Sequence, residues 1–193
     1  MKNKDTIIRL CVWATMTAIV FFGNMLRIKF AVPLGGVTSL TFANVFCALA
    51  GILLGPWGGF FAAGFGSGLY DLTDPAYVAD VPFTIVTKGI YGLVAGLIIY
   101  RLFRSDKEKY VPQLAATVCA AAAYAVAYLV KNYFYNARFL HNLTEPAECW
   151  AYIVAKVPAT VTNGVIAVIF APILGVAIWK ALHKNNLDRL FPE

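Results

Sequence analysis

Long apolar runs dominate the sequence and constrain its fold more than any other feature. A helix that crosses a bilayer needs about 20 predominantly apolar residues. Six apolar runs stand out, at about residues 7–28, 41–55, 57–72, 83–103, 111–136 and 148–182. Charged residues make up only 13% of the chain, whereas a soluble domain has roughly 25%. We therefore predict an all-α membrane protein, with one domain of six transmembrane helices over residues 1–193.

Glycine and proline mark breaks within these runs. The segment 55–59, with the sequence GPWGG, separates the second run from the third and predicts a tight helical hairpin. The last run exceeds the thickness of a bilayer, so we expect its helix to tilt or to be interrupted near Pro158 or Pro172. The first run follows a short basic segment, but no small-x-small cleavage site comes after it, and we expect a retained helix rather than a signal peptide.

Basic residues are distributed unevenly among the predicted loops. Ten of the 16 lie in the N-terminal tail, in the loop between the fourth and fifth helices, or in the C-terminal tail. Cytoplasmic loops carry an excess of Lys and Arg, so we expect both termini to be cytoplasmic, in a bacterial inner membrane. This bias also accounts for the net charge of +6. No basic stripe interleaved with aromatic residues indicates nucleic-acid binding.

Motifs for metal binding and for intramembrane catalysis are missing from the sequence. The four cysteines are scattered, and no Cys/His spacing predicts a metal site, so we expect neither a metal nor a cofactor. There is no HExxH motif, no pair of intramembrane aspartates and no Gly-x-Ser-Gly of a rhomboid-type protease. We therefore do not expect an enzyme.

Polar residues recur at helical spacing in the outer halves of three predicted helices. The three sets are Thr84, Lys88 and Tyr91; Tyr124, Tyr128, Asn132 and Tyr135; and Tyr152, Lys156, Thr160 and Asn163. Each set occupies one helix face. Ionisable groups inside a bilayer are energetically expensive and usually functional. If the three faces converge, they form a pocket with aromatic walls and a few hydrogen-bonding groups, as small-molecule sites have.

A candidate substrate-binding set follows from these faces. It comprises Lys88, Tyr91, Tyr128, Asn132, Trp150, Lys156 and Asn163. Structural roles stay open for some of them: Trp150 and the tyrosines near helix ends also suit the aromatic belt of a membrane protein, and Lys88 can extend its ammonium group to the interface. The excess of basic groups near the outer mouth indicates a ligand with a carboxylate or another electron-rich edge, unless nearby acidic residues pair with them.

Two outer loops and one helix face complete the candidate residues. Gly35 and Gly36 follow the first run, and Asp71 and Tyr77 follow the third, so that these loops are either lids or solvated connectors. In the first run, Ala14 and Ala18 form an AxxxA pattern, which permits close packing between helices in lipid.

Several motifs along residues 10–100 share their order with a known family. They are Leu34-Gly35-Gly36, the stretch 50–59 that ends in GPWGG, the stretch 66–72 (GSGLYDL), Pro82-Phe83-Thr84 and Lys88-Gly89. In this order they resemble the substrate-binding S component of energy-coupling factor (ECF) vitamin transporters. The resemblance implies six helices, a substrate bound near the outer face, and docking of Ala14 and Ala18 on a coupling subunit.

A coupling module would supply the energy for such a transporter. The resemblance implies two ATPase subunits, and the chain itself has no GxxxxGK[ST] phosphate loop. Residues 111–193 match no subgroup of known specificity, so folate-, pantothenate-, riboflavin- and hydroxymethylpyrimidine-like ligands all stay open. The alternative is a self-sufficient secondary transporter, which typically shows inverted repeats and embedded acids; neither is evident in this sequence.

Overall fold

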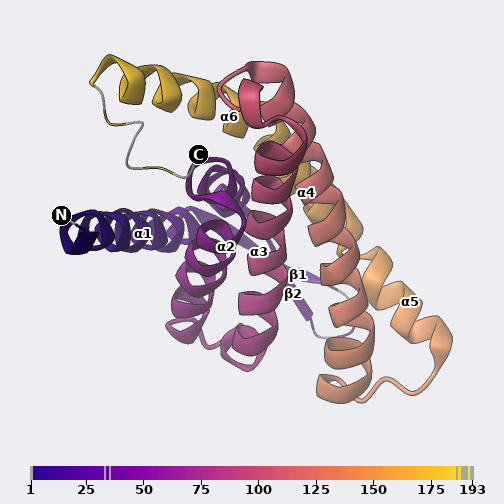
Figure 1. Ribbon diagram of the computed structural model, residues 1–193. Coiled ribbons are helices and arrows are strands. Elements are labelled where there is room, and N and C mark those ends of the chain that lie inside the picture. Colours follow the sequence, from indigo (N-terminus) through magenta and orange to yellow (C-terminus); the bar gives the residue numbers. More distant parts are fainter. Residues whose placement is uncertain (1, 33, 35, 186, 188–190, 192–193) are drawn as a thin grey trace.

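The computed structural model describes residues 2–32, 34, 36–185, 187 and 191, and it is mainly helical (Figure 1). The helices are α1 (Lys2–Met25), α2 (Ala43–Leu72), α3 (Val81–Leu97), α4 (Tyr110–Lys131), α5 (Pro146–Val154) and α6 (Val157–Lys184). The strands are β1 (Arg27–Val32) and β2 (Gly36–Thr41). π-Helical segments extend α3 through Ile98–Leu102 and α4 through Asn132–Leu140.

Five helical stretches among the described residues are long and apolar enough to cross a membrane. They are Thr6–Met25, Ala43–Leu72, Val78–Leu102, Tyr110–Leu140 and Pro146–Lys184. The sequence predicts six, because it divides the second stretch into runs 41–55 and 57–72. The difference therefore lies within α2.

The chain reverses direction inside α2. Gly55 has a φ of 77°, in the left-handed region that favours glycine. A Cβ atom on Gly59 would lie 2.5 Å from Cα of Gly51, whereas eight residues of straight helix span about 12 Å. The predicted hairpin is thus confirmed. Its first arm is shorter than the roughly 20 residues of a complete span, so six full crossings stay a prediction.

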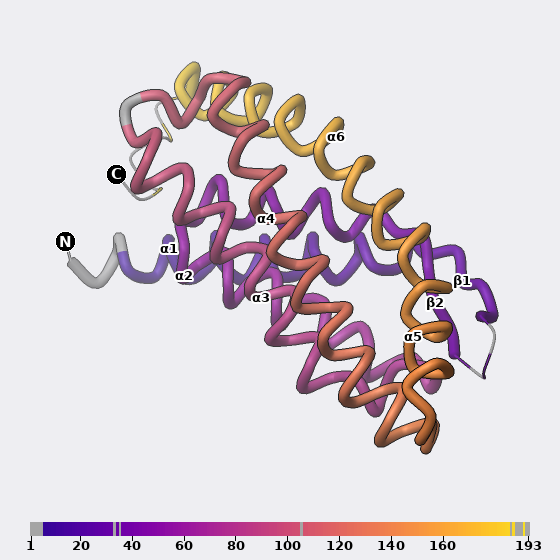
Figure 2. The backbone as a smooth tube through the Cα atoms, turned by 90° about the vertical axis from the view of Figure 1, so that its right-hand side faces the viewer, coloured from indigo at the N-terminus to yellow at the C-terminus, as the bar shows by residue number. Residues whose placement is uncertain are grey.

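Both ends of α2 accordingly lie beside β1. Thr41, two residues before α2, pairs with Arg27 in the strand register. Asp71, near the other end of α2, accepts a hydrogen bond from the same Arg27 at 3.1 Å. In Figure 2 the middle of α2 lies at the end of the molecule away from the two strands, together with the start of α1 and the end of α6.

The segment after α1 departs from the all-α prediction. Its two strands form an antiparallel hairpin, with register from Arg27↔Thr41 to Val32↔Gly36. The first predicted run extended to residue 28, and only a loop was expected at 33–37. Alternating polar and apolar residues in Arg27–Val32 and β-branched residues in Gly36–Thr41 favour strands. This short pattern directly follows a long apolar run, so the predicted helix was extended to residue 28 and the two strands were not predicted, while the mainly helical class agrees with the structure.

Glycines allow α2 and α3 to pack closely. A Cβ atom on Gly96 would lie 2.5 Å from the backbone nitrogen of Pro56, and one on Gly92 would overlap the carbonyl of Gly59. Small residues let helix backbones approach in lipid, where van der Waals packing replaces the hydrophobic effect. The second arm of α2 and helix α3 therefore form one closely packed wall.

The last apolar run is interrupted, as predicted. α5 ends at Val154 and α6 begins at Val157, with Pro158 in its first turn. Proline suits this position because it has no backbone N–H to donate there. The other predicted position, Pro172, lies inside α6.

Candidate substrate-binding site

A small polar cavity lies under the β-hairpin, between the helices. Its lining comes from β1, β2, the end of α2, the link after it, the first half of α3, α4 and α6. The lining residues are Arg27, Thr38, Ser39, Thr41, Asp71, Tyr77, Asp80, Thr84, Thr87, Lys88, Tyr124, Tyr128, Lys131, Thr160 and Asn163. The cavity volume is about 50 Å³, which is room for a few water molecules.

Aromatic rings from α4 form one wall of this cavity. Tyr124 and Tyr128, one helical turn apart, stack with ring centroids 5.6 Å apart and an interplanar angle of 26°. The ammonium of Lys88 lies 4.8 Å from the centroid of the Tyr124 ring, and that of Lys131 lies 5.5 Å from the Tyr128 ring. Tyrosine faces attract cations through their quadrupole, so each ring holds one lysine at the cavity.

Two ion pairs also border the cavity. Arg27 Nη1 lies 3.1 Å from Asp71 Oδ1, and Lys131 Nζ lies 2.9 Å from Asp80 Oδ2. Asn136 donates two further hydrogen bonds to the Asp80 carboxylate, at 3.0 and 3.2 Å. Buried charges are tolerated only when they are paired and hydrogen-bonded in this way.

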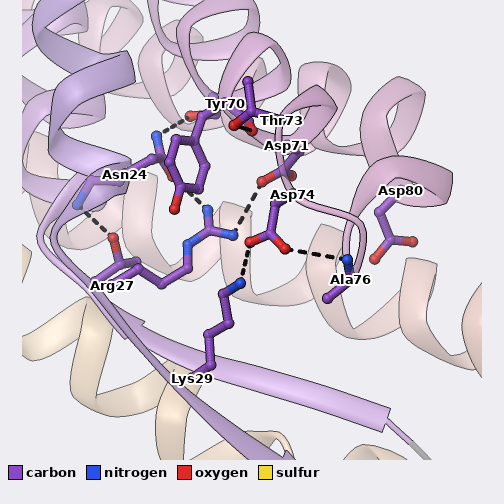
Figure 3. A network of polar contacts seen from close by, with 12 residues as sticks. Asn24, Arg27, Lys29, Tyr70, Asp71, Thr73, Asp74, Ala76 and Asp80 are labelled. Atoms are coloured by element: carbon purple, nitrogen blue, oxygen red, sulfur yellow. Dashed lines mark hydrogen bonds and ion pairs between the residues drawn. The ribbon is translucent and has the colours of Figure 1, made fainter.

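Strand β1 is held against the end of α2 by a network centred on Arg27 (Figure 3). Arg27 donates to Asn24 Oδ1 at 2.7 Å and to Asp71, and its guanidinium lies 4.7 Å from the ring centroids of both Tyr70 and Tyr77. The planar guanidinium is suited to such stacking. This network fastens the hairpin over the cavity.

A second ion pair adds to this fastening from the solvent side. Lys29 Nζ lies 2.6 Å from Asp74 Oδ2, in the link after α2. The hydrogen bond to Asp74 raises the pKa of Lys29, because it favours the charged ammonium. Burial raises the pKa of Tyr77, so its phenol stays neutral at physiological pH.

Strand β2 is fastened to the other side of the cavity, on α6. Asn163 donates from Nδ2 to the carbonyl of Ser39 at 2.7 Å, and its Oδ1 accepts from the backbone N–H of Thr41 at 2.8 Å. Lys156, just before α6, donates to the carbonyl of Val37 at 2.8 Å. These three bonds satisfy backbone groups along β2 and tie the hairpin to the helical bundle.

The family model for the ECF-type riboflavin transporter S component matches residues 4–180. The chain belongs to this family. The resemblance inferred from the sequence is therefore confirmed, and the protein is a membrane transport component of a class that comprises no enzymes. No curated protein gave a significant match.

Five residues predicted for the site or its lids line the cavity of this S component. They are Lys88, Tyr128, Asn163, Asp71 and Tyr77. They come from α3, α4, α6, the end of α2 and the link after it. The structure thus brings them together, although their binding role stays a prediction.

Four predicted substrate-binding residues lie elsewhere. Tyr91 is fully buried behind the cavity wall, 5.5 Å from the Tyr124 ring, and Asn132 is buried with its amide donating to the carbonyl of Tyr128. Lys156 contacts β2 as described above. Trp150 is 60% exposed on the outside of α5 and packs on Tyr133, as a residue of the aromatic belt would be.

The remaining predicted residues are the glycines and alanines. Gly36 is buried at the start of β2, where a Cβ would lie 2.6 Å from the Tyr152 ring. Gly35 lies outside the described residues. Ala14 and Ala18 are exposed along α1.

Sequence reasoning did not include several residues of the cavity in the candidate set. Arg27, Asp80 and Lys131 provide three of its charges, and Thr38 and Thr41 face it from β2. A strand pattern at 36–41 would place Thr38 and Thr41 on opposite faces of β2, so periodicity alone would not have grouped them. Lys131, three residues after Tyr128, lies on the same helix face.

Proposed function

We propose that this chain is the substrate-binding subunit of an ECF-type importer and captures a vitamin or vitamin precursor in the cavity under the β-hairpin. The observation that carries the proposal is a cavity rich in charged and hydroxyl side chains within a bundle of apolar helices. Such groups are expensive inside a membrane and mark substrate sites. Riboflavin, the substrate in the family's name, and folate-, pantothenate- and hydroxymethylpyrimidine-like molecules are the candidates.

Loading of the site requires the hairpin to move. Pockets for small molecules have volumes of roughly 300–1,000 Å³, whereas this cavity has about 50 Å³. The ties of β1 to α2 through Arg27, and of β2 to α6 through Asn163, would open and close again over the substrate. We assign the hairpin and the link 73–80 as the lid.

The proposed topology has six crossings, cytoplasmic termini and the cavity on the outer side. The start of α1 and the end of α6 lie at the same end of the molecule, opposite the hairpin (Figure 2). The basic connection between α3 and α4, which includes Arg101 and Arg104, agrees with a cytoplasmic location by the positive-inside rule. The membrane in this proposal is the bacterial cell membrane.

Transport would depend on partners. Ala14 and Ala18 present an exposed small-residue surface on α1, which suits close packing against a helix of the coupling subunit. Two ATPase subunits would provide the energy through that subunit. The whole S component would then reorient in the membrane to deliver its substrate.

Native mass spectrometry of the purified full chain tests the proposal. We expect one vitamin-sized molecule bound per chain, and co-purification of a coupling subunit and two ATPases from a host that expresses all four proteins. Uptake by the isolated chain in liposomes, driven by a proton or sodium gradient, would instead support the secondary transporter.

A further inference from the structure

The charges around the cavity do not balance. Its lining contains three cationic and two anionic side chains. Arg27 pairs with Asp71, and Lys131 pairs with Asp80. The cation that is left is Lys88.

Lys88 is buried, and its direct contacts are with neutral groups. Its side chain comes from α3, and the residue is only 6% exposed. Nζ donates to the side-chain oxygen of Asn44 and lies 4.8 Å from the centroid of the Tyr124 ring. Among the described residues, no carboxylate oxygen lies within 4.0 Å of this Nζ.

An ammonium group in this position is costly without a counter-charge. An amide oxygen and a ring face recover part of its lost hydration, but a buried charge is normally paired with an opposite charge. Both carboxylates of the cavity already have cationic partners. A close counter-charge for a charged Lys88 would therefore come from outside the chain, through the cavity that Lys88 borders.

We infer, on the basis of the proposed function, that the substrate carries an anionic group, a carboxylate or a phosphate, which binds Lys88. The hydroxyl groups of Thr84 and Thr87 lie on the same helix, within four residues, and also line the cavity. They supply hydrogen-bond donors beside the ammonium. The stacked rings of Tyr124 and Tyr128 face the remainder of the substrate.

This inference divides the candidate ligands by charge. Pantothenate and folate carry carboxylates, whereas riboflavin and hydroxymethylpyrimidine are neutral. Two matched pairs isolate the effect of charge: pantothenate with its neutral alcohol pantothenol, and the phosphate ester FMN with riboflavin. Isothermal titration of the purified full chain with these six compounds measures each affinity directly.

The variants Lys88→Gln and Lys88→Arg then test the assigned residue. We expect an anionic compound to bind more tightly than its neutral partner. Lys88→Gln should lower the affinity for the anionic compound by about 30-fold or more, as loss of one member of a buried charge pair does. Lys88→Arg, which keeps the charge, should retain most of the preference for the anion. Arg138→Gln, at an exposed cation of the same outer region, is the control and should change affinity less than about 3-fold.

The outcomes separate this inference from the proposed function. Tight binding of riboflavin or hydroxymethylpyrimidine, with no preference for an anion, overturns the inference and leaves the S-component function standing. An anion that binds equally well to Lys88→Gln also overturns it. If none of the six compounds binds and no molecule co-purifies, the proposed function fails, and the inference fails with it. The comparison among ligands uses the unmodified chain, so it decides the question even if Lys88→Gln does not fold.

Discussion

Two neighbouring ion pairs should contribute very differently to closure of the β-hairpin. Arg27 and Lys29 both extend from β1, and each binds an aspartate near the end of α2. The side chains of Arg27 and Asp71 are 5% and 3% exposed, whereas in the second pair Lys29 is 43% exposed and Asp74 is 6% exposed. The matched substitutions Arg27→Met and Lys29→Met therefore compare a buried pair with one that solvent reaches.

The expected magnitudes follow from this difference in burial. Removing one member of a buried ion pair costs about 3–5 kcal/mol, because the other charge stays buried without a partner. Lys29→Met also leaves a buried carboxylate, but solvent reaches the Lys29 end of this pair and screens it, and the backbone N–H of Ala76 still donates to Asp74 at 3.2 Å. We therefore expect a cost near that of an exposed pair, about 0.2–1 kcal/mol. For a chain of this size each kcal/mol shifts the melting temperature by roughly 2–4 °C. We expect Arg27→Met to lower it by about 6–20 °C and Lys29→Met by less than about 4 °C.

Thermal unfolding of the purified full chain in detergent measures both shifts. The double variant Arg27→Met/Asp71→Asn should lose less stability than the two single variants lose in sum. Each single variant leaves one buried charge without its partner, whereas the double variant leaves none. Arg27→Met should also speed ligand dissociation, because it frees one side of the lid. Equal shifts for Arg27→Met and Lys29→Met, or additive effects in the double variant, would refute the reasoning.

Three further outcomes are expected. Gly92→Ala should destabilise the protein by about 1–3 kcal/mol, because its new methyl group overlaps a backbone carbonyl of α2, whereas Gly164→Ala, whose Cβ meets its nearest neighbour at 3.8 Å, should be neutral or stabilising in the same melting assay. Replacing Ala14 and Ala18 with leucine should abolish uptake by cells that express the whole complex while ligand affinity of the purified chain stays unchanged; an equal loss of binding would contradict a docking role. Because the pKa of Lys29 is raised above its ordinary 10.5, its ion pair is intact at neutral pH and is lost only as the pH rises through this raised pKa. Ligand dissociation rates of wild type and Lys29→Met should therefore differ below the raised pKa and be the same above it.

Sequence reasoning succeeded where the signal is local. A run of apolar residues specifies a membrane helix by itself, since every backbone group is satisfied within the helix. The reversal at Gly55-Pro56 and the interruption near Pro158 likewise follow from the conformational limits of single residues. The order of motifs was sufficient to indicate the S-component family, which the family model confirms.

Helical spacing was less informative about the site. Lys88 and Tyr91 lie three residues apart on one predicted face, yet Lys88 borders the cavity and Tyr91 is buried behind it. Spacing identifies a helix face, but the depth of a residue on that face depends on which neighbour packs against it. Lys156 shows the same limit, because its partner is a carbonyl of β2, 119 residues earlier in the chain.

The sequence by itself thus determined the apolar helices, their breaks and the family. Only the tertiary structure decided that β1 and β2 cover a cavity, that Asp71 and Asp80 are each paired with a cation, and that Lys88 has no carboxylate partner among the described residues. The reason is physical: hydropathy and backbone preference act within a few residues. Charge pairing depends on distances of a few ångströms between segments, and Arg27 and Asp71 are separated by 44 positions in the chain.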